Sequence, residues 1–310
     1  MLTSKNKDYV LGIDIGGSKL MIGIINSEGQ IVTKNKYKWG TDLTGEKVIN
    51  TILEKSNNIL KNNDYKVRGA GAAIPGLADK EKGLWVYSCF SGIKNIKIRD
   101  ILAEKLGIPV VIDNDVNVCA FGEKIFGKCK HINDYLWITV SNGVGGAVYT
   151  NGQLYPGAFN CSGEIGHINV VENGAQCDCG KKGCLEAYVS GPAIVRRFLS
   201  KTSDFDKSEI TAKRISEMAR NKNKKALKVF SKSGYYLGKA IAAAANLINP
   251  ERVVLGGGVS MAMDLFEEEL EKSLDKFVFA EANKKLSVVQ TGLSYNAALI
   301  GAGAMALEEL

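Results

Sequence analysis

Apolar and polar residues alternate along the first part of the chain in two distinct periods. Short apolar runs separated by glycine turns predict a meander of three strands over 10–13, 20–25 and 30–35. The apolar residues of 45–61 recur at every third or fourth position, which is the spacing of an amphipathic helix. We also expect strands over 67–73 and 110–113 and a helix over 98–106. This mixture of strands and helices indicates an α/β fold.

The same pattern returns in the middle of the chain. A strand over 135–140, a glycine-rich turn over 141–146 and strands over 147–150 and 153–155 look like a second copy of the opening meander. Later elements are helices over 193–200, 211–220 and 234–247, a strand over 252–255, a further helix after the glycines that follow it, and a last helix over 297–307. We therefore expect two similar α/β halves around a central cleft.

The composition of the chain mainly excludes certain classes of protein and partner. With 310 residues, 45% of them hydrophobic and 24% charged, the chain has an ordinary globular composition, which excludes intrinsic disorder. The net charge of +7 is spread along the chain, so we expect no nucleic-acid partner. The beginning of the sequence has no apolar targeting stretch and no segment is typical of a membrane helix, so we expect a cytoplasmic protein with no membrane partner.

The first candidate site is the turn Asp14-Ile15-Gly16-Gly17-Ser18-Lys19 at the end of the first strand. Paired glycines allow backbone N–H groups to approach a phosphate, and an acidic residue at a strand end can hold Mg²⁺ directly or through water. A plain β-turn with a surface aspartate is the alternative interpretation. The glycine turn at 143–146 is the matching candidate in the second half, so two such turns could hold the phosphates of one nucleotide.

The second candidate is Asn114-Asp115, which follows the buried strand over 110–113. An aspartate at this position can take a proton from a hydroxyl that attacks phosphorus, and Asn114 offers a donor and an acceptor to a polyol. The same residues also suit a helix N-cap before the helical stretch 118–126. The sequence leaves both interpretations open.

The most specific signal is a group of cysteines and one histidine. Three of the seven cysteines and one of only two histidines lie close together in the sequence. Three thiolates and an imidazole make a four-ligand tetrahedral zinc site with no open position, so we expect a structural ion. We expect the ion to fix the neighbouring carboxylates Glu164 and Glu186, for which the alternative is an ordinary surface position. The predicted ligands are His167, Cys177, Cys179 and Cys184.

A weaker signal is the strand over 252–255 with the glycines that follow it. Gly256, Gly257 and Gly258 precede a helix start, which can receive the ribose or adenine of a nucleotide. Such turns are also common without a ligand.

Together these motifs resemble the ROK family (repressors, open reading frames, kinases) of the actin-like sugar kinase superfamily. The resemblance runs from about Val10 to the end of the chain and is carried by D-I-G-G-S-K, N-D-V-N, E-I-G-H, C-D-C-G-K-K-G-C-L-E-A and L-G-G-G-V-S. It implies two actin-like, ribonuclease H-like lobes. The smaller comprises 1–116 with about 297–310, and the larger comprises 117–296 with the zinc-binding segment 167–184. It also implies ATP and Mg²⁺ as cofactors and a homodimer.

The resemblance also implies a role for each matched residue. Asp115 would be the catalytic base that takes the proton from the 6-hydroxyl of a sugar. The ligands of the sugar hydroxyls would be Asn114, Asp115, Glu164, His167 and Glu186, with His167 binding zinc through its other nitrogen. The phosphates and Mg²⁺ would lie at Asp14, Gly16, Gly17, Ser18 and Lys19 of the first turn and at Asn142, Gly143 and Gly145 of the second, and the adenosine at Gly256, Gly257 and Gly258.

Three departures from the family pattern bear on these expectations. The second phosphate turn reads S-N-G-V-G-G-A over 141–147 where family kinases usually have G-T-G-x-G-G-G. The segment 88–95 reads S-C-F-S-G-I-K-N and lacks the common N-L-x-G-W run that borders the sugar pocket in the family. Ser18 stands where threonine is commoner. These differences concern nucleotide geometry and the choice of sugar.

The resulting hypothesis is an ATP-dependent, glucokinase-like hexose 6-kinase. A kinase for N-acetylmannosamine or N-acetylglucosamine is the first alternative, and a fructokinase comes after it. A sugar-sensing regulator is the alternative of another class. Family repressors carry a helix-turn-helix region before the first phosphate motif, and only 13 residues precede Asp14 here, so we expect the kinase.

Overall fold

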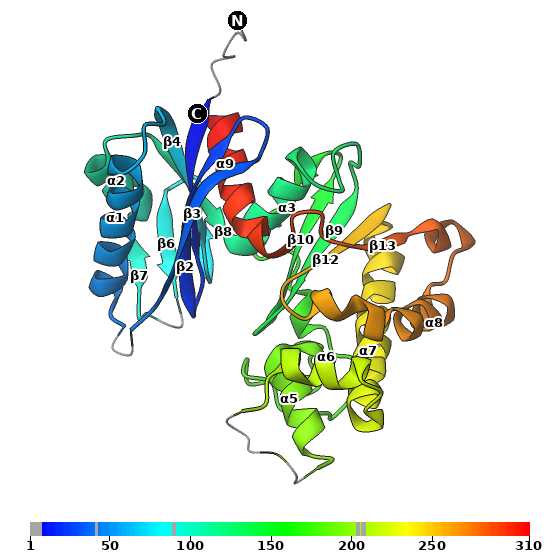
Figure 1. Cartoon of the computed structure of the whole chain (residues 1–310). Coiled ribbons are helices and arrows are strands. Elements are labelled where there is room, and N and C mark those ends of the chain that lie inside the picture. Colours follow the sequence, from blue (N-terminus) through cyan, green and yellow to red (C-terminus); the bar gives the residue numbers. More distant parts are fainter. Residues whose placement is uncertain (1–7, 41–42, 89–90, 203–204, 206–208) are drawn as a thin grey trace, which may run out of the picture. The chain divides into compact units, whose positions relative to one another are not determined.

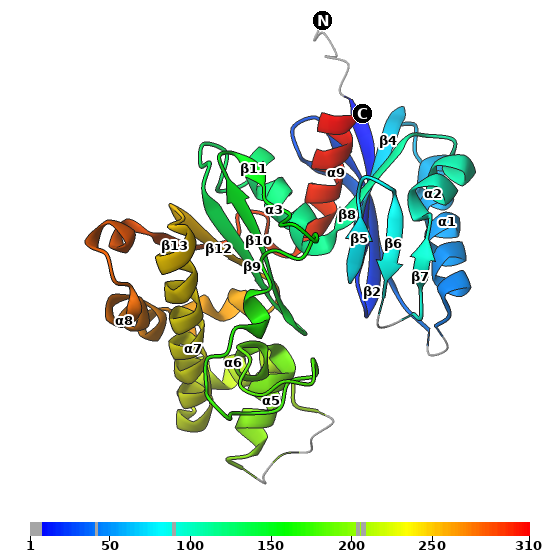
Figure 2. The ribbon, with the colours of Figure 1, turned by 180° about the vertical axis from the view of Figure 1, so that it is seen from behind.

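The computed structural model describes residues 8–40, 43–88, 91–202, 205 and 209–310. The chain forms two compact units, of which the first comprises Met1–Lys130 with Asn296–Leu310 and the second His131–Tyr295. Each unit is built on a five-stranded sheet with helices packed against it (Figures 1 and 2).

The sheet of the first unit has the order β3-β2-β1-β4-β8. The first three strands are antiparallel, and β4 and β8 run parallel to β1. Apolar residues of α1 and α2 pack on one face, and α9 and α3 pack on the other (Figure 1). The elements are β1 (Tyr9–Ile15), β2 (Lys19–Asn26), β3 (Ile31–Lys38), α1 (Gly45–Lys61), β4 (Val67–Ile74), α2 (Ile98–Leu106), β8 (Val110–Asn114), α3 (Asp115–Ile125) and α9 (Ala297–Glu309).

The boundary of this unit lies further along the chain than residue 116, where the resemblance places it. Helix α3 packs directly against α9, and a Cβ atom on Gly301 would lie 2.0 Å from the carbonyl oxygen of Val118. Glycine at this position permits the close approach of the two helices. Helix α3 therefore belongs with the first unit, which ends at Lys130.

A small antiparallel sheet of β5 (Leu77–Asp79), β6 (Leu84–Tyr87) and β7 (Lys94–Ile96) lies between β4 and α2 in the chain. The apolar pattern did not predict it. Its centre is the buried Trp85, whose indole N–H donates to the carbonyl of Pro75 at 3.0 Å. Of the segment 88–95, which departs from the family pattern, Cys89 and Phe90 lie outside the described residues.

The sheet of the second unit has the order β11-β10-β9-β12-β13, with β9 to β11 antiparallel and β12 and β13 parallel to β9. This order repeats that of the first unit, three antiparallel strands followed by two parallel ones. The prediction of two similar halves is confirmed. The strands are β9 (Tyr135–Val140), β10 (Val144–Thr150), β11 (Gln153–Leu154), β12 (Arg252–Gly256) and β13 (Ser287–Gln290).

Most helices of the second unit lie in the long connection between β11 and β12. Helix α7 begins ten residues before the predicted start at 234, because Asn223 caps it and Val229 and Phe230 are buried. Four lysines in the same stretch mask this apolar spacing in the sequence. The helices are η1 (Ile165–His167), α4 (Glu186–Val189), α5 (Gly191–Leu199), α6 (Ala212–Arg220), α7 (Lys224–Ile248), η2 (Ser260–Leu265), α8 (Glu267–Phe277), η3 (Glu281–Lys285) and η4 (Ser294–Asn296), where η denotes a 3-10 helix.

Candidate functional site

Two aspartates lie at the carboxyl edge of the first sheet. Asp14 is the last but one residue of β1, and Asp115 is the first residue of α3, directly after β8. Because β1, β4 and β8 are parallel neighbours, their carboxyl ends meet at one edge, where open α/β sheets place ligand sites. Both side chains are partly buried, so Asp14 is not the surface residue of a plain turn.

Burial raises the pKa of both groups, and at Asp115 the charge of Asp14 adds to this effect. Burial, and secondly the negative charge of Asp14, raise the pKa of Asp115 from its ordinary value of 3.8 to about 7. Burial raises the pKa of Asp14 to about 6, against the opposing effect of Lys19. A carboxylate with a pKa near neutrality is suited to accept a proton from a hydroxyl and to release it again.

The turn after Asp14 is closed by backbone contacts. The N–H of Gly16 donates to the carbonyl of Lys19 at 2.9 Å, and the indole N–H of Trp39 donates to the carbonyl of Gly16 at 2.6 Å. Gly17 and Ser18 are exposed at the tip. Neither Gly16 nor Gly17 has a positive φ, so the turn geometry does not require glycine at either position. The N–H of Gly16 is already used within the turn, so the exposed tip at Gly17 and Ser18 is the part of the turn open to a ligand.

Asn114 caps helix α3. Its Oδ1 accepts from the backbone N–H groups of Val116 at 2.9 Å and Asn117 at 3.4 Å, and its Nδ2 donates to the carbonyl of Gly76 at 2.7 Å. The capping interpretation is therefore confirmed. A side-chain hydrogen bond from Asn114 also lowers the pKa of Asp115, against the larger effect of burial.

In the second unit, Glu186 connects two of the predicted sites. Its Oε2 accepts from the backbone N–H of Val144 at 2.8 Å, and its Oε1 lies 3.6 Å from Sγ of Cys177. A Cβ on Gly143 would lie 2.7 Å from the same Oε2, so glycine leaves room for the carboxylate. Glu186 is half-buried and fixed at both oxygens, unlike an ordinary surface carboxylate.

The second glycine turn is shorter than predicted. Val144 already pairs with Val140 in the β10–β9 ladder, which leaves 141–143 as the turn. The N–H of Ser141 donates to the carbonyl of Gly143 at 2.8 Å, and Asn142 is exposed at the tip. Gly145, a predicted phosphate contact, lies within β10 opposite Thr139.

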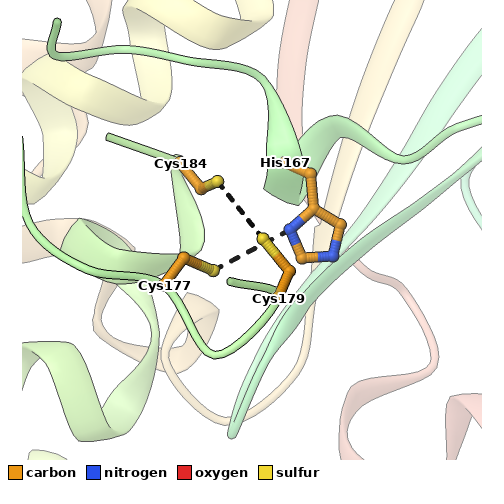
Figure 3. Close-up of side chains that lie close together, drawn as sticks. All are labelled: His167, Cys177, Cys179 and Cys184. Carbon is orange, nitrogen blue, oxygen red and sulfur yellow. Dashed lines mark hydrogen bonds between the residues drawn. The ribbon is translucent and has the colours of Figure 1, made fainter. Parts of the chain in front are cut away.

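His167, Cys177, Cys179 and Cys184 come together as predicted (Figure 3). Their four ligand atoms lie within 4.8 Å of one another. Sγ of Cys179 lies 3.7 Å from Sγ of Cys184, and Nδ1 of His167 lies 3.9 Å from Sγ of Cys177. Tetrahedral zinc with Zn–S bonds of about 2.3 Å requires S···S separations of about 3.8 Å. The donor set and its spacing therefore fit a four-coordinate zinc ion.

The imidazole of His167 has a different neighbour on each side. Its Nδ1 faces the cysteines, while its Nε2 lies 4.0 Å from a carboxylate oxygen of Glu164. The helical turn η1 that carries it packs tightly on β10, because a Cβ on Gly166 would lie 2.0 Å from the carbonyl oxygen of Val144. One ring nitrogen can thus bind a metal while the other serves a ligand.

The three glycines after β12 differ in their surroundings. Gly256 is buried, and a Cβ there would lie 2.3 Å from the ring of Trp137, so this residue serves packing. Gly257 has a φ of +84°, which favours glycine. Gly258 is exposed, and a Cβ there would meet nothing within 4 Å. Only the last two have any surface available to a ligand.

A recess of about 720 Å³ lies beside the second glycine turn. Its walls are largely apolar and come from α5 and the start of α6, and Asn142 of the turn contributes to its rim. The volume is in the usual range for a small-molecule site. The sequence pattern did not single out this recess, because its residues come from two helices and a turn that are far apart in the chain.

Two α/β units with one strand order, the first with an aspartate beside a glycine turn, define the sugar kinase fold of the actin-like ATPase superfamily. The chain matches the ROK family over residues 10–309 and belongs to it. Among the described residues, no helix combines the length and apolar character needed to cross a bilayer.

Three known proteins illustrate the similarity. A glucokinase of Halalkalibacterium halodurans is 32% identical, over 95% of this chain and 94% of that protein. The crystal structure of a ROK family glucokinase from Streptomyces griseus in complex with glucose and AMPPNP has a TM-score of 0.85 at 30% identity and covers 96% of this chain and 99% of its own. The xylose repressor of Bacillus subtilis is 28% identical over 77% of this chain and 61% of the repressor.

Proposed function

We propose that the protein is an ATP-dependent sugar kinase that phosphorylates the 6-hydroxyl of a hexose. The observation that carries this proposal is the pair Asp14 and Asp115 at one sheet edge, with a pKa of about 7 for Asp115. The similarity to glucokinases over nearly the whole chain supports the class of reaction and makes glucose the first substrate to test.

Asp115 acts as the general base. In phosphoryl transfer the protein chiefly positions the reactants and stabilises charge, so one base at the attacking hydroxyl suffices. Asp14 is the residue that would hold Mg²⁺, directly or through water, and the ion would neutralise charge on the phosphate oxygens. Gly17 and Ser18 are exposed residues at the tip of the turn, and their backbone N–H groups are suited to contact phosphates.

The sugar hydroxyls are bound by groups with a free polar atom. His167 offers Nε2, and Glu164 offers an exposed carboxylate. The amide of Asn114 already contacts Gly76, Val116 and Asp115, so it binds a hydroxyl by exchanging one of these contacts. One oxygen of Glu186 already accepts from the backbone N–H of Val144, so Glu186 would hold the start of β10 and bind a sugar hydroxyl at the same time. This set serves glucose and an N-acetylated hexosamine equally well, and the substrate assay must separate them.

The nucleotide is bound in the second unit. Asn142 and Gly143 at the turn contact the phosphates, Gly257 and Gly258 lie toward the adenosine, and the recess beside Asn142 receives the base. His167 and the three cysteines would hold zinc, which would fix the segment that carries Glu186. The homodimer implied by the resemblance stays a prediction.

The test is ADP release with Mg-ATP and glucose, mannose, N-acetylglucosamine, N-acetylmannosamine, allose or fructose. Asp115→Asn serves as the blank, and Asp100→Asn, an exposed aspartate on α2, serves as the matched control. We expect turnover on at least one sugar that Asp115→Asn lacks and Asp100→Asn keeps. Sugar binding without any turnover in the wild-type protein would overturn the kinase proposal in favour of a sugar sensor.

A further inference from the structure

The segment that follows the glycine turn at 256–258 has little intrinsic stability. It forms the short 3-10 helix η2, in which Ala262 has non-helical dihedral angles (φ −110°, ψ 28°). No side chain caps its beginning. Because 3-10 hydrogen bonds have poorer geometry than those of an α-helix, the position of η2 depends on contacts from other elements.

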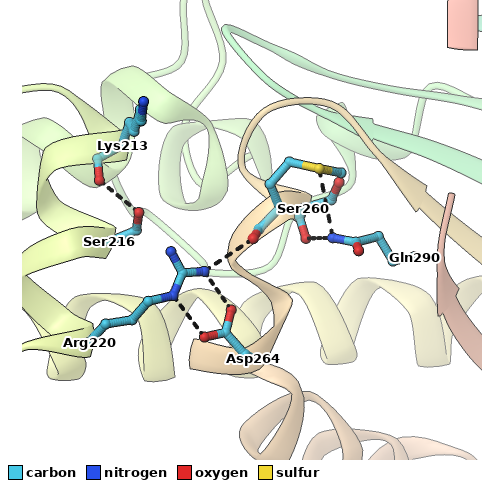
Figure 4. A network of polar contacts seen from close by, with 7 residues as sticks. Lys213, Ser216, Arg220, Ser260, Asp264 and Gln290 are labelled. Atoms are coloured by element: carbon cyan, nitrogen blue, oxygen red, sulfur yellow. Dashed lines mark hydrogen bonds and ion pairs between the residues drawn. The ribbon is translucent and has the colours of Figure 1, made fainter. Parts of the chain in front are cut away.

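Arg220, the last residue of α6, provides three of these contacts (Figure 4). Its Nε donates to Oδ2 of Asp264 at 3.0 Å, and its Nη2 donates to Oδ1 of the same carboxylate at 2.7 Å. Nη2 also donates to the carbonyl of Met261 at 3.2 Å. A bidentate pair fixes orientation as well as distance, so Arg220 holds both turns of η2 against the end of α6.

From η2 the contacts continue to the glycine turn. Nε2 of Gln290 in β13 donates to the carbonyl of Ser260 at 2.6 Å, and the buried Oγ of Ser260 donates to the carbonyl of Gly257 at 2.7 Å. The N–H of Val259 donates to the carbonyl of Val140 at 3.0 Å. A Cβ on Gly257 would lie 2.5 Å from that same carbonyl oxygen. The glycine turn is therefore held tightly against the end of β9.

The opposite end of α6 forms part of the recess. Ile210, Thr211 and Ala212 line it, and Oγ1 of Thr211 caps the helix by accepting from the N–H of Arg214. The start of α5 is attached to the turn after β9, because the N–H of Gly191 donates to the carbonyl of Ser141 at 2.7 Å. Helix α6, nine residues long, thus spans from the recess to η2.

We propose that Arg220 and Asp264 are positioning residues for nucleotide binding, because their ion pair fixes the spacing between the recess and the glycine turn at 256–258. This inference rests on the proposed function, in which these two features hold the nucleotide. Neither side chain lines the recess, so removing either one affects the binding of ATP without removing a contact with ATP. Both side chains are about half exposed, which limits the size of the effect.

The test uses Arg220→Ala, Asp264→Ala and the exchanged double variant Arg220→Asp/Asp264→Arg. We expect each single variant to raise the KM and the calorimetric Kd for Mg-ATP about threefold to tenfold, the effect of losing one charge-assisted pair. The kcat and the KM for the sugar change by less than about twofold. The double variant, in which the pair can form in reverse, has a lower Kd than either single variant.

Lys272→Ala is the control, because it removes an exposed ion pair with Glu268 on α8 and leaves η2 untouched. If Arg220→Ala does not fold, Arg220→Lys replaces it, since lysine keeps the charge and loses the fork, and a smaller rise in Kd is expected. The inference is overturned if the single variants match Lys272→Ala, if the sugar KM rises equally, or if the exchange gives no recovery. A wild-type protein that does not bind Mg-ATP would instead refute the proposed function.

Discussion

Replacing Asp115 with asparagine tests the electrostatics of the site without reference to any substrate. Asparagine has nearly the same shape, and its amide oxygen can still accept from the N–H of Val116, as Oδ1 of Asp115 does at 3.0 Å. The substitution removes only the charge that burial and Asp14 disfavour. We therefore expect the variant to lose activity and to gain stability.

The magnitude follows from the pKa of Asp115. A rise from 3.8 to about 7 corresponds to at most about 4 kcal/mol at pH 8. The carboxylate keeps some contact with solvent, so screening reduces the gain to about 1–2 kcal/mol. Because the pKa is raised in the folded state, the wild-type protein loses stability as the pH rises from about 4 to about 7 and no further above it. The variant lacks this loss of stability. Its gain in free energy of unfolding over wild type therefore reaches about a third of the full value at pH 5 and the full value above pH 7.

The assay is urea unfolding of wild type and Asp115→Asn between pH 5 and pH 8, without Mg²⁺ or nucleotide, with Asp100→Asn as control. Turnover, measured in parallel, falls by a factor of about 10² to 10⁴, the usual contribution of a general base. A variant that is less stable than wild type at pH 8, or whose advantage does not change with pH, would refute the reasoning that a desolvated carboxylate lies at this position.

Two further predictions concern the metal segment. Elemental analysis of fresh protein should give about one zinc per chain. Cys179→Ser should lower both the melting temperature and the sugar affinity, whereas Cys161→Ser, at an exposed free cysteine, should change neither. Metal-free protein or equal behaviour of the two variants would contradict the zinc site. Gly183→Ala should lower the free energy of unfolding in urea by about 3 kcal/mol or more, because φ is +81° and a Cβ would lie 1.9 Å from the carbonyl oxygen of Val171. Gly180→Ala, with φ +87° and open space around the Cβ, should lower it by about 1 kcal/mol. Equal decreases for the two variants would show that steric contact does not matter at Gly183.

The sequence predicted the elements whose apolar spacing is regular. Helices α1 and α2 and strand β9 have the predicted bounds, and the repeated strand order was visible as a repeated meander. The cysteine cluster was predicted because ligand identity alone limits the geometry. Each of these signals is local or chemically specific.

What the sequence missed depends on contacts between distant residues. The sheet β5-β6-β7 is made of strands of three or four residues, too short to show a period. The contact of Trp39 with Gly16 needs the three-dimensional arrangement to be seen. The sequence offered the capping of α3 by Asn114 as one of two interpretations, and the structure shows that contact. Val144 belongs to β10 and not to the turn, because strand pairing with Val140 overrides the turn preference of the glycines around it.

The two oxygens of Glu186 have a practical consequence for kinetic work. One oxygen accepts from the backbone at the beginning of β10, and the other faces Cys177 of the predicted zinc site, so zinc bound there would be linked to the turn that precedes β10 through this one side chain. A purification that strips part of the metal would then produce a mixture of molecules with different nucleotide affinities. Metal content is consequently a quantity to determine for every batch before rate constants of two variants are compared.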